Sequence, residues 1–110
     1  MKVVHYRDIK PIEEVKGVLR REVITAEDGA PLFTMRVFEV EAGSSTASHS
    51  HPWEHEVFVL SGRGIVAGAE GAIPIAKESV IFVAPDEAHC FVNNGNEPLR
   101  FICVIPLQKE

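Results

Sequence analysis

Four of the five histidines in this sequence are gathered in two short segments. Three of them stand in the run 48–56, and the fourth follows a Pro-Asp turn further along the chain: His49, His51, His55 and His89. Neutral imidazole is the side chain that binds metals most often, and four of them suit a divalent transition metal rather than calcium or magnesium, which prefer oxygen. A single H-x-H pair also arises by chance, so the spacing must be weighed with the structure expected around it.

The spacing of these histidines predicts how they meet. If the segment is a strand, His49 and His51 point to the same face, because side chains alternate along a strand. Pro52 has no N–H for a strand ladder, so we expect the strand to end there and a turn to bring His55 back toward the same centre. His89 is expected on a separate strand. The pattern predicts a metal site at which these side chains converge.

Short runs rich in β-branched and aromatic residues predict the elements that position this cluster. They are residues 18–24, 33–40, 57–60, 64–67, 79–83 and 99–105, separated by turns rich in Gly, Pro, Asn and Asp. No stretch keeps the three-four spacing of an amphipathic helix. We expect one all-β domain over residues 1–110, a sandwich or barrel with little or no helix. Residues 1–20 are expected to form an arm that pairs with an edge strand, either of its own chain or of a partner.

Composition excludes several classes of protein. The chain has 110 residues and a formal net charge of −5, with no basic cluster beyond short pairs, which argues against a nucleic-acid partner. No apolar run approaches the length of a membrane helix and the first residues do not resemble a signal peptide, so we expect a cytoplasmic protein with no membrane contact. The two cysteines, Cys90 and Cys103, are expected to be free thiols.

The segment 43–93 resembles the two sequence motifs of the cupin superfamily. The first motif is a glycine, five residues, H-x-H, three or four residues, a glutamate, six residues and a glycine. Gly43, the H-x-H pair and Gly62 match it. The position of the glutamate, with six residues between it and Gly62, is taken by His55. Glu56 is one residue too close and points by strand alternation to the opposite face, so His55 is favoured over Glu56 as a ligand.

The second motif is a glycine, five residues, P-x-G, two residues, a histidine, three residues and an asparagine. His89 and Asn93 match it, and Ala84 stands at the proline position. Glu78 and Asp86 replace the two glycines, and Asp tolerates turn conformations well enough for that turn to survive. The run 49–60 and the ending 101–106 are similar to a subgroup of small cupins with an all-histidine site.

This resemblance implies a double-stranded β-helix, which is a jelly-roll-like cupin barrel, commonly a homodimer. It implies one divalent transition metal, with manganese or iron as the first expectation, although affinity order favours nickel, copper, zinc or cobalt in a purified sample. Four neutral ligands leave the charge of the ion uncompensated, which favours a small, anionic ligand. The reaction stays open among a dioxygenase-like oxidoreductase acting on a small organic molecule, a non-catalytic binding or sensing module, and a sugar or keto-acid isomerase.

Strand parity also predicts the surroundings of the metal. Phe91 shares a face with His89, Phe101 and Cys103 share a face of the last strand, and an inward Arg36 would fix a carboxylate; plain barrel core or surface is the alternative for each. Metal-bound imidazoles need acceptors for their second nitrogen, a role for which Glu54 and Glu56 are candidates. Trp53 is expected to anchor its turn, His5 to face solvent, and Cys90 to pack away from the metal.

Overall fold

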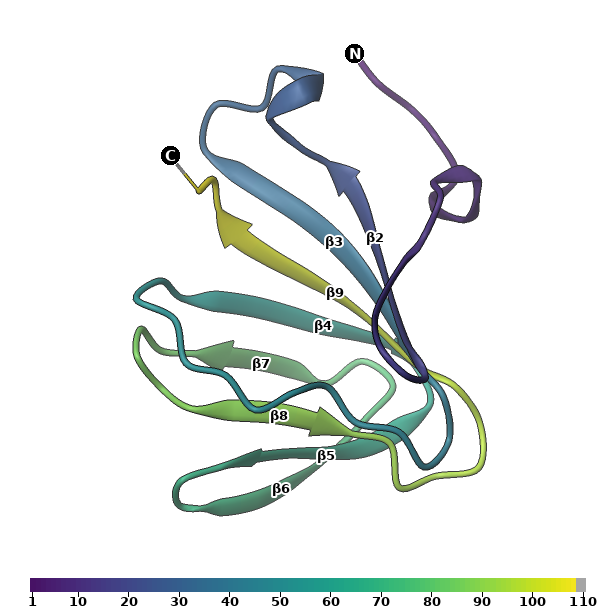
Figure 1. The fold of residues 1–110 in the computed structure, drawn as a ribbon, viewed down its shortest axis with the longest axis vertical. Helices are drawn as coiled ribbons and strands as arrows, with labels where there is room; N and C mark the ends of the chain where they lie inside the picture. Colours follow the sequence, from purple (N-terminus) through teal and green to yellow (C-terminus); the bar gives the residue numbers. More distant parts are fainter. Residues whose placement is uncertain (109–110) are drawn as a thin grey trace.

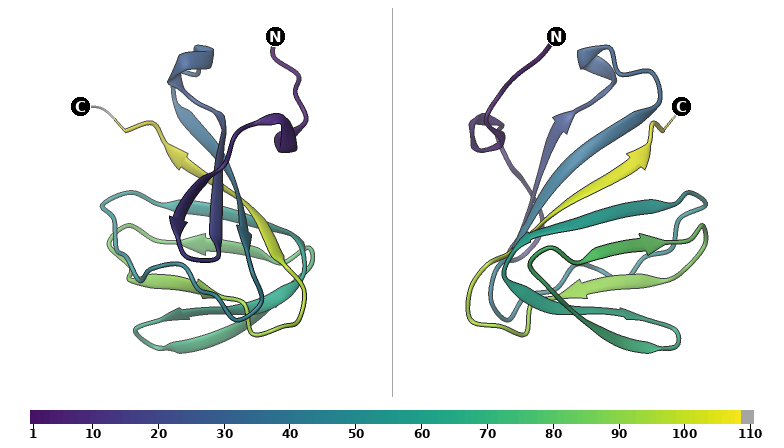
Figure 2. Two further views of the ribbon diagram at one scale, coloured as in Figure 1. Left: turned by 45° about the vertical axis from the view of Figure 1, so that its right-hand side comes forward. Right: turned by 180° about the vertical axis from the view of Figure 1, so that it is seen from behind.

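Two antiparallel sheets form the protein, whose residues 1–108 are described by a computed structural model. The larger sheet has the strand order β1-β2-β3-β9-β4-β7 and the smaller one the order β6-β5-β8. Figures 1 and 2 show the smaller sheet packed against the part of the larger sheet that contains β4 and β7, while β2 and β3 extend beyond it. The strands are β1 Ile12–Val15, β2 Val18–Ile24, β3 Phe33–Val40, β4 His55–Ser61, β5 Arg63–Gly68, β6 Gly71–Ala76, β7 Val80–Val83, β8 His89–Val92 and β9 Leu99–Pro106. The expected all-β barrel with little helix is confirmed, since the only helical pieces in the described chain are short 3-10 turns at Tyr6–Asp8 and Ala26–Asp28.

The core lies between the two sheets. Strand β9 sits at the centre of the larger sheet, pairs with both β3 and β4, and alternates between buried and half-buried residues along its whole length. Its buried face meets side chains from β3, β4 and β8, and Phe101 stacks on Phe38 with ring centroids 5.0 Å apart and packs against Phe91 at 4.6 Å. This packing makes the inner face of the larger sheet a rigid wall, on which further side chains of the same parity are held in place.

Two strands were not predicted, and both lie at sheet edges. Strand β1 contains two consecutive glutamates and β6 contains Gly71 and Pro74, residue types that sheets disfavour. Each is held by pairing with its neighbour rather than by its own propensity: β1 pairs with β2, and β6 pairs with β5. The expected N-terminal arm therefore contains an edge strand, β1, that pairs within its own chain.

Left-handed backbone occurs at several turns of the described chain, including turns at motif positions. Gly62, between β4 and β5, has φ +84°, and a Cβ there would stand 2.4 Å from the carbonyl oxygen of Pro98. Glu78 and Asp86, the residues that replace the glycines of the second motif, have φ +72° and +66°. The turn geometry of that motif therefore survives both replacements, as expected for Asp86.

None of the helical segments among residues 1–108 is long and apolar enough to cross a membrane.

Candidate metal centre

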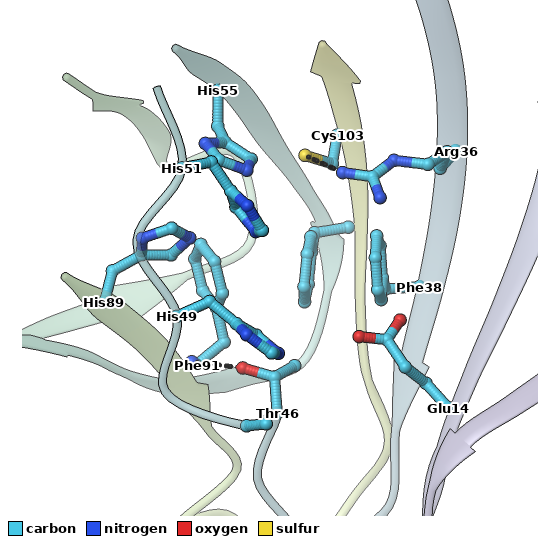
Figure 3. Close-up of a pocket in the computed structure, with 12 residues that line it drawn as sticks. Glu14, Arg36, Phe38, Thr46, His49, His51, His55, His89, Phe91 and Cys103 are labelled. Atoms are coloured by element: carbon cyan, nitrogen blue, oxygen red, sulfur yellow. Dashed lines mark hydrogen bonds between the residues drawn. The ribbon is translucent and has the colours of Figure 1, made fainter. Parts of the chain in front are cut away.

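All four clustered histidines line one pocket (Figure 3). His55 begins β4 in the larger sheet and His89 begins β8 in the smaller sheet. His49 and His51 come from the connection between β3 and β4, which runs along β8. The histidines are thus contributed by both sheets and by the segment that bridges them.

His49 and His51 do not lie in a regular strand, so that prediction is wrong, although both side chains reach the pocket as expected. The segment 44–51 is attached to β8 by isolated bridges, Ser45 to Val92 and His49 to His89, rather than by a continuous ladder. Mutual backbone bonds join His49 and His89, with N···O distances of 3.1 and 2.9 Å. The bridges suffice to place His49 beside His89, and the turn that follows Pro52 ends the pairing.

The turn between β7 and β8 positions two of the rings. The backbone N–H of Asp86 donates to the carbonyl oxygen of His51 at 2.6 Å, and the side chain of Glu87 accepts from the backbone N–H of Ala84 at 3.0 Å. The Nδ1 atom of His89 lies 2.9 Å from the carbonyl oxygen of Glu87. Because a carbonyl oxygen only accepts, this contact places the proton on Nδ1 and leaves the lone pair of Nε2 for a metal.

The separations within three neighbouring pairs of rings match those of two ligands on one ion. With a metal–nitrogen distance of about 2.1 Å, two imidazoles on one ion have centroids about 4.6 Å apart at a right angle and about 5.3 Å apart at a tetrahedral angle. The observed separations are 5.5 Å for His49 and His51, 5.4 Å for His51 and His55, and 4.7 Å for His55 and His89. Among residues 1–108, no three such side chains already have their donor atoms arranged as a metal site, so binding requires the rings to rotate.

His55 is the most buried of the four and is 5% exposed. Burial, followed by the charges of His89, Arg36 and His51, lowers the pKa of His55 from 6.5 to about 4. Burial also lowers the pKa of His51, with His49 the next cause. The Nδ1 atom of His55 is buried and has no hydrogen-bond partner in the described chain. A neutral imidazole with an unpartnered, desolvated nitrogen is the form that a metal requires.

Glu54 and Glu56 do not lie where they would accept hydrogen bonds from the histidines of the cluster. Glu56 is exposed on the outer face of β4, opposite to the buried face that carries His55. A hydrogen bond with Glu56 raises the pKa of Glu54, which places these two carboxyl groups beside each other. The acceptor that the structure gives to a histidine of the cluster is instead a main-chain oxygen, that of Glu87.

The four residues expected from strand parity also line the pocket: Arg36, Phe91, Phe101 and Cys103. Figure 3 shows Arg36 and Cys103 across the pocket from the histidines, whereas Phe91 lies beside His89. Cys103 is 3% exposed, and burial raises the pKa of its thiol. Glu14, Phe38 and Thr46 also line the pocket and were not predicted. Phe38 has the same strand parity as Arg36, a signal that would have found it, whereas Glu14 lies on the unpredicted strand β1.

The remaining expectations concern Trp53, His5 and Cys90. Trp53 is half-buried, packs against the core and stacks on His51 at 4.6 Å, so it anchors the turn and also supports one ring of the cluster. His5 is exposed, as expected. Cys90 is half-buried, pairs with Ala67 in the smaller sheet, and, like Cys103, is a free thiol.

The fold and the histidine-lined pocket have the form of a cupin, and the comparison with known families agrees. The cupin domain model matches residues 36–105, a range that includes both motifs. The chain therefore belongs to the cupin family.

The solved structures and curated proteins that are similar to this chain include the following three. The polyketide cyclase RemF of Streptomyces resistomycificus is 32% identical, with a TM-score of 0.91 over 98% of this chain and 80% of that one. A predicted oxalate decarboxylase of Thermotoga maritima is 28% identical, with a TM-score of 0.83 over 97% of this chain and 100% of that one. The oxalate-binding protein of Thermotoga maritima is 36% identical over 66 residues, which are 59% of this chain and 54% of that relative.

Proposed function

We propose that this protein is a metal-dependent enzyme that binds one divalent manganese or iron ion through His49, His51, His55 and His89. The observation that carries the proposal is the gathering of four imidazoles from both sheets and their connecting segment around one pocket, with ring separations suited to a shared ion. When bound, such an ion supplies Lewis acidity and one-electron redox chemistry.

The residues of this chain supply the rest of the site. The contact of His89 with the Glu87 carbonyl fixes which of its nitrogens faces the pocket, and Trp53 holds the ring of His51 by stacking. The three phenylalanines that line the pocket keep part of its wall dry, which strengthens electrostatic interactions inside it. These features support a dioxygenase-like oxidation of a small organic molecule as the reaction.

Metal content and oxygen uptake test the proposal together. The protein is purified without added metal, loaded separately with Mn(II) or Fe(II), and assayed for oxygen consumption with a panel of small carboxylates and phenols. Near-stoichiometric metal measured by mass spectrometry, together with substrate-dependent oxygen uptake absent from the metal-free protein, is the expected result. Failure to retain metal at neutral pH would refute the proposal at its first step.

A non-catalytic binding module is the second candidate, because one relative is named an oxalate-binding protein. Tight binding of a small anion by the metal-loaded protein, with no turnover across the panel, would favour it over an enzyme. The homodimer and the cytoplasmic location stay predictions. Light scattering on the purified protein measures its oligomeric state.

A further inference from the structure

The pocket contains an arginine, Arg36, that forms no ion pair among the described residues. The guanidinium of Arg36 donates from Nη2 to the Sγ atom of Cys103 at 3.2 Å and lies over the ring of Phe38, 5.1 Å from its centroid. Its Nε atom is buried without a partner, and none of the ion pairs among residues 1–108 includes Arg36. A thiol is a weak acceptor, so the hydrogen-bonding capacity of this partly desolvated guanidinium is only partly used.

Glu14, the acidic residue that lines the pocket, is already engaged elsewhere. Its Oε2 atom accepts a hydrogen bond from Nη1 of Arg20 at 2.8 Å. Arg20 also lies beside Glu22, at 3.2 Å. Glu22 lies opposite Arg36 in the register of β2 and β3, and its Oε2 atom is buried without a hydrogen-bond partner. Neither Glu14 nor Glu22 forms an ion pair with Arg36 among the described residues, so the donors of Arg36 that face the pocket remain free for a ligand.

The strand register places Arg36 across the pocket from the histidines. Arg36 pairs with Cys103 on β9, and on the other side of β9 Val57 pairs with the same Cys103. His55 is two residues before Val57 on the same buried face, so the Cα atoms of Arg36 and His55 are two strands and two residues apart, about 12 Å. Figure 3 shows the guanidinium and the histidine rings on opposite sides of the pocket, both turned into it.

The space between them is small. The cavity has a volume of about 60 Å³. A volume of this order suits a small ligand rather than a large one.

We propose that Arg36 binds the carboxylate of a small organic acid of this size, whose other end faces the four histidines. The inference rests on the proposed function and specifies its substrate class. Phe38 and Cys103 hold the guanidinium in place, so little side-chain entropy is lost when the acid binds, and the planar donor fork of Arg36 matches the two carboxylate oxygens.

Calorimetric titration of the metal-loaded protein tests this assignment with acetate, glycolate and pyruvate, which have four to six non-hydrogen atoms, and with the neutral amides of the same acids. We expect the best acid to bind at least about 10-fold more tightly than its amide, because hydrogen bonds to a charged group are the stronger ones. Arg36→Met should weaken binding of the acid about 10- to 100-fold and leave amide binding unchanged. Arg36→Lys, which keeps the charge without the fork, should fall between wild type and Arg36→Met.

Metal content separates failure of this inference from failure of the proposed function. Arg63→Met, at an exposed arginine outside the pocket, is the matched control and should bind the acid as wild type does. Equal metal content in all variants with unchanged acid binding in Arg36→Met would overturn the assignment, as would a wild-type protein that binds none of the three acids at millimolar concentration. If the wild type retains no metal, the proposed function fails, and the same titrations on the metal-free protein decide the role of Arg36 alone.

Discussion

Replacing His55 and Glu56 separately is the sharpest test of the proposed ligand set. The two residues are adjacent in β4, but His55 is 5% exposed with an unpartnered Nδ1, whereas Glu56 lies on the outer face of the strand. His55→Ala removes one ring of the cluster. Glu56→Ala removes a carboxylate that points away from it.

The expected size of the effect follows from linkage between binding and folding. Loss of a residue that merely supports a ligand weakens metal affinity about 10- to 100-fold, so we take about 100-fold for loss of His55 itself. At a metal concentration 100 times the wild-type Kd, binding stabilises the folded state by about 2.7 kcal/mol, but by only about 0.4 kcal/mol in His55→Ala. For a chain of this length 1 kcal/mol shifts the Tm by about 4 °C, so the two shifts are about 11 °C and 2 °C.

Thermal unfolding with and without metal, combined with metal content, measures these shifts. Glu56→Ala should behave as wild type in both assays, and the metal-free Tm of each variant controls for loss of stability unrelated to the ion. If Glu56→Ala loses the metal-dependent shift while His55→Ala keeps it, the register argument that places His55 in the ligand set is refuted.

Three further substitutions or treatments test other parts of the structure. Gly62→Ala should lower the free energy of unfolding by at least about 2 kcal/mol, seen as a fall in Tm, because its φ is positive and a Cβ would meet the carbonyl oxygen of Pro98; an unchanged Tm would contradict this geometry. Glu78→Gly should raise stability by about 0.5 to 1 kcal/mol, because it relieves a left-handed conformation at a modest entropic cost, and a lower Tm would count against it. In the folded protein at pH 8, a thiol reagent should modify Cys90 first and Cys103 slowly, because burial raises the pKa of Cys103 and blocks access to it. Equal labelling rates for the two thiols would refute this account. Because the raised pKa keeps Cys103 protonated in the folded state, the free energy of unfolding should also fall as the pH rises above about 9, where the thiol of the unfolded chain ionises.

The strands that contribute most of the core can be predicted from the sequence alone. Residues 18–24 and 33–40 were predicted with the bounds that β2 and β3 have, because β-branched and aromatic residues dominate both runs. Strands β1 and β6 were missed because their residues, glutamates in one and Gly, Ala and Pro in the other, form strands only when a neighbour is present to pair with them. Local propensity carries no information about such a neighbour.

The residues of the pocket also fall into a predicted group and a group that the sequence does not predict. Strand parity placed Arg36, Phe91, Phe101 and Cys103 on the pocket wall, because each lies on a strand that the sequence makes recognisable. Glu14 enters the pocket only through the pairing of β1 with β2, so no local pattern announces it. The main-chain acceptor of His89 and the stacking of Trp53 on His51 are likewise products of tertiary structure.

The histidine cluster lies where the two sheets meet. β7 and β8 belong to different sheets, and at this end the two sheets are joined through the segment 44–51, the contact of Asp86 with His51, and the mutual bonds of His49 and His89. An ion bound by both His55 of the larger sheet and His89 of the smaller sheet would link the two sheets at this end. Metal binding should therefore stabilise the contact between the two sheets and slow amide hydrogen exchange at residues 44–51 and in β8.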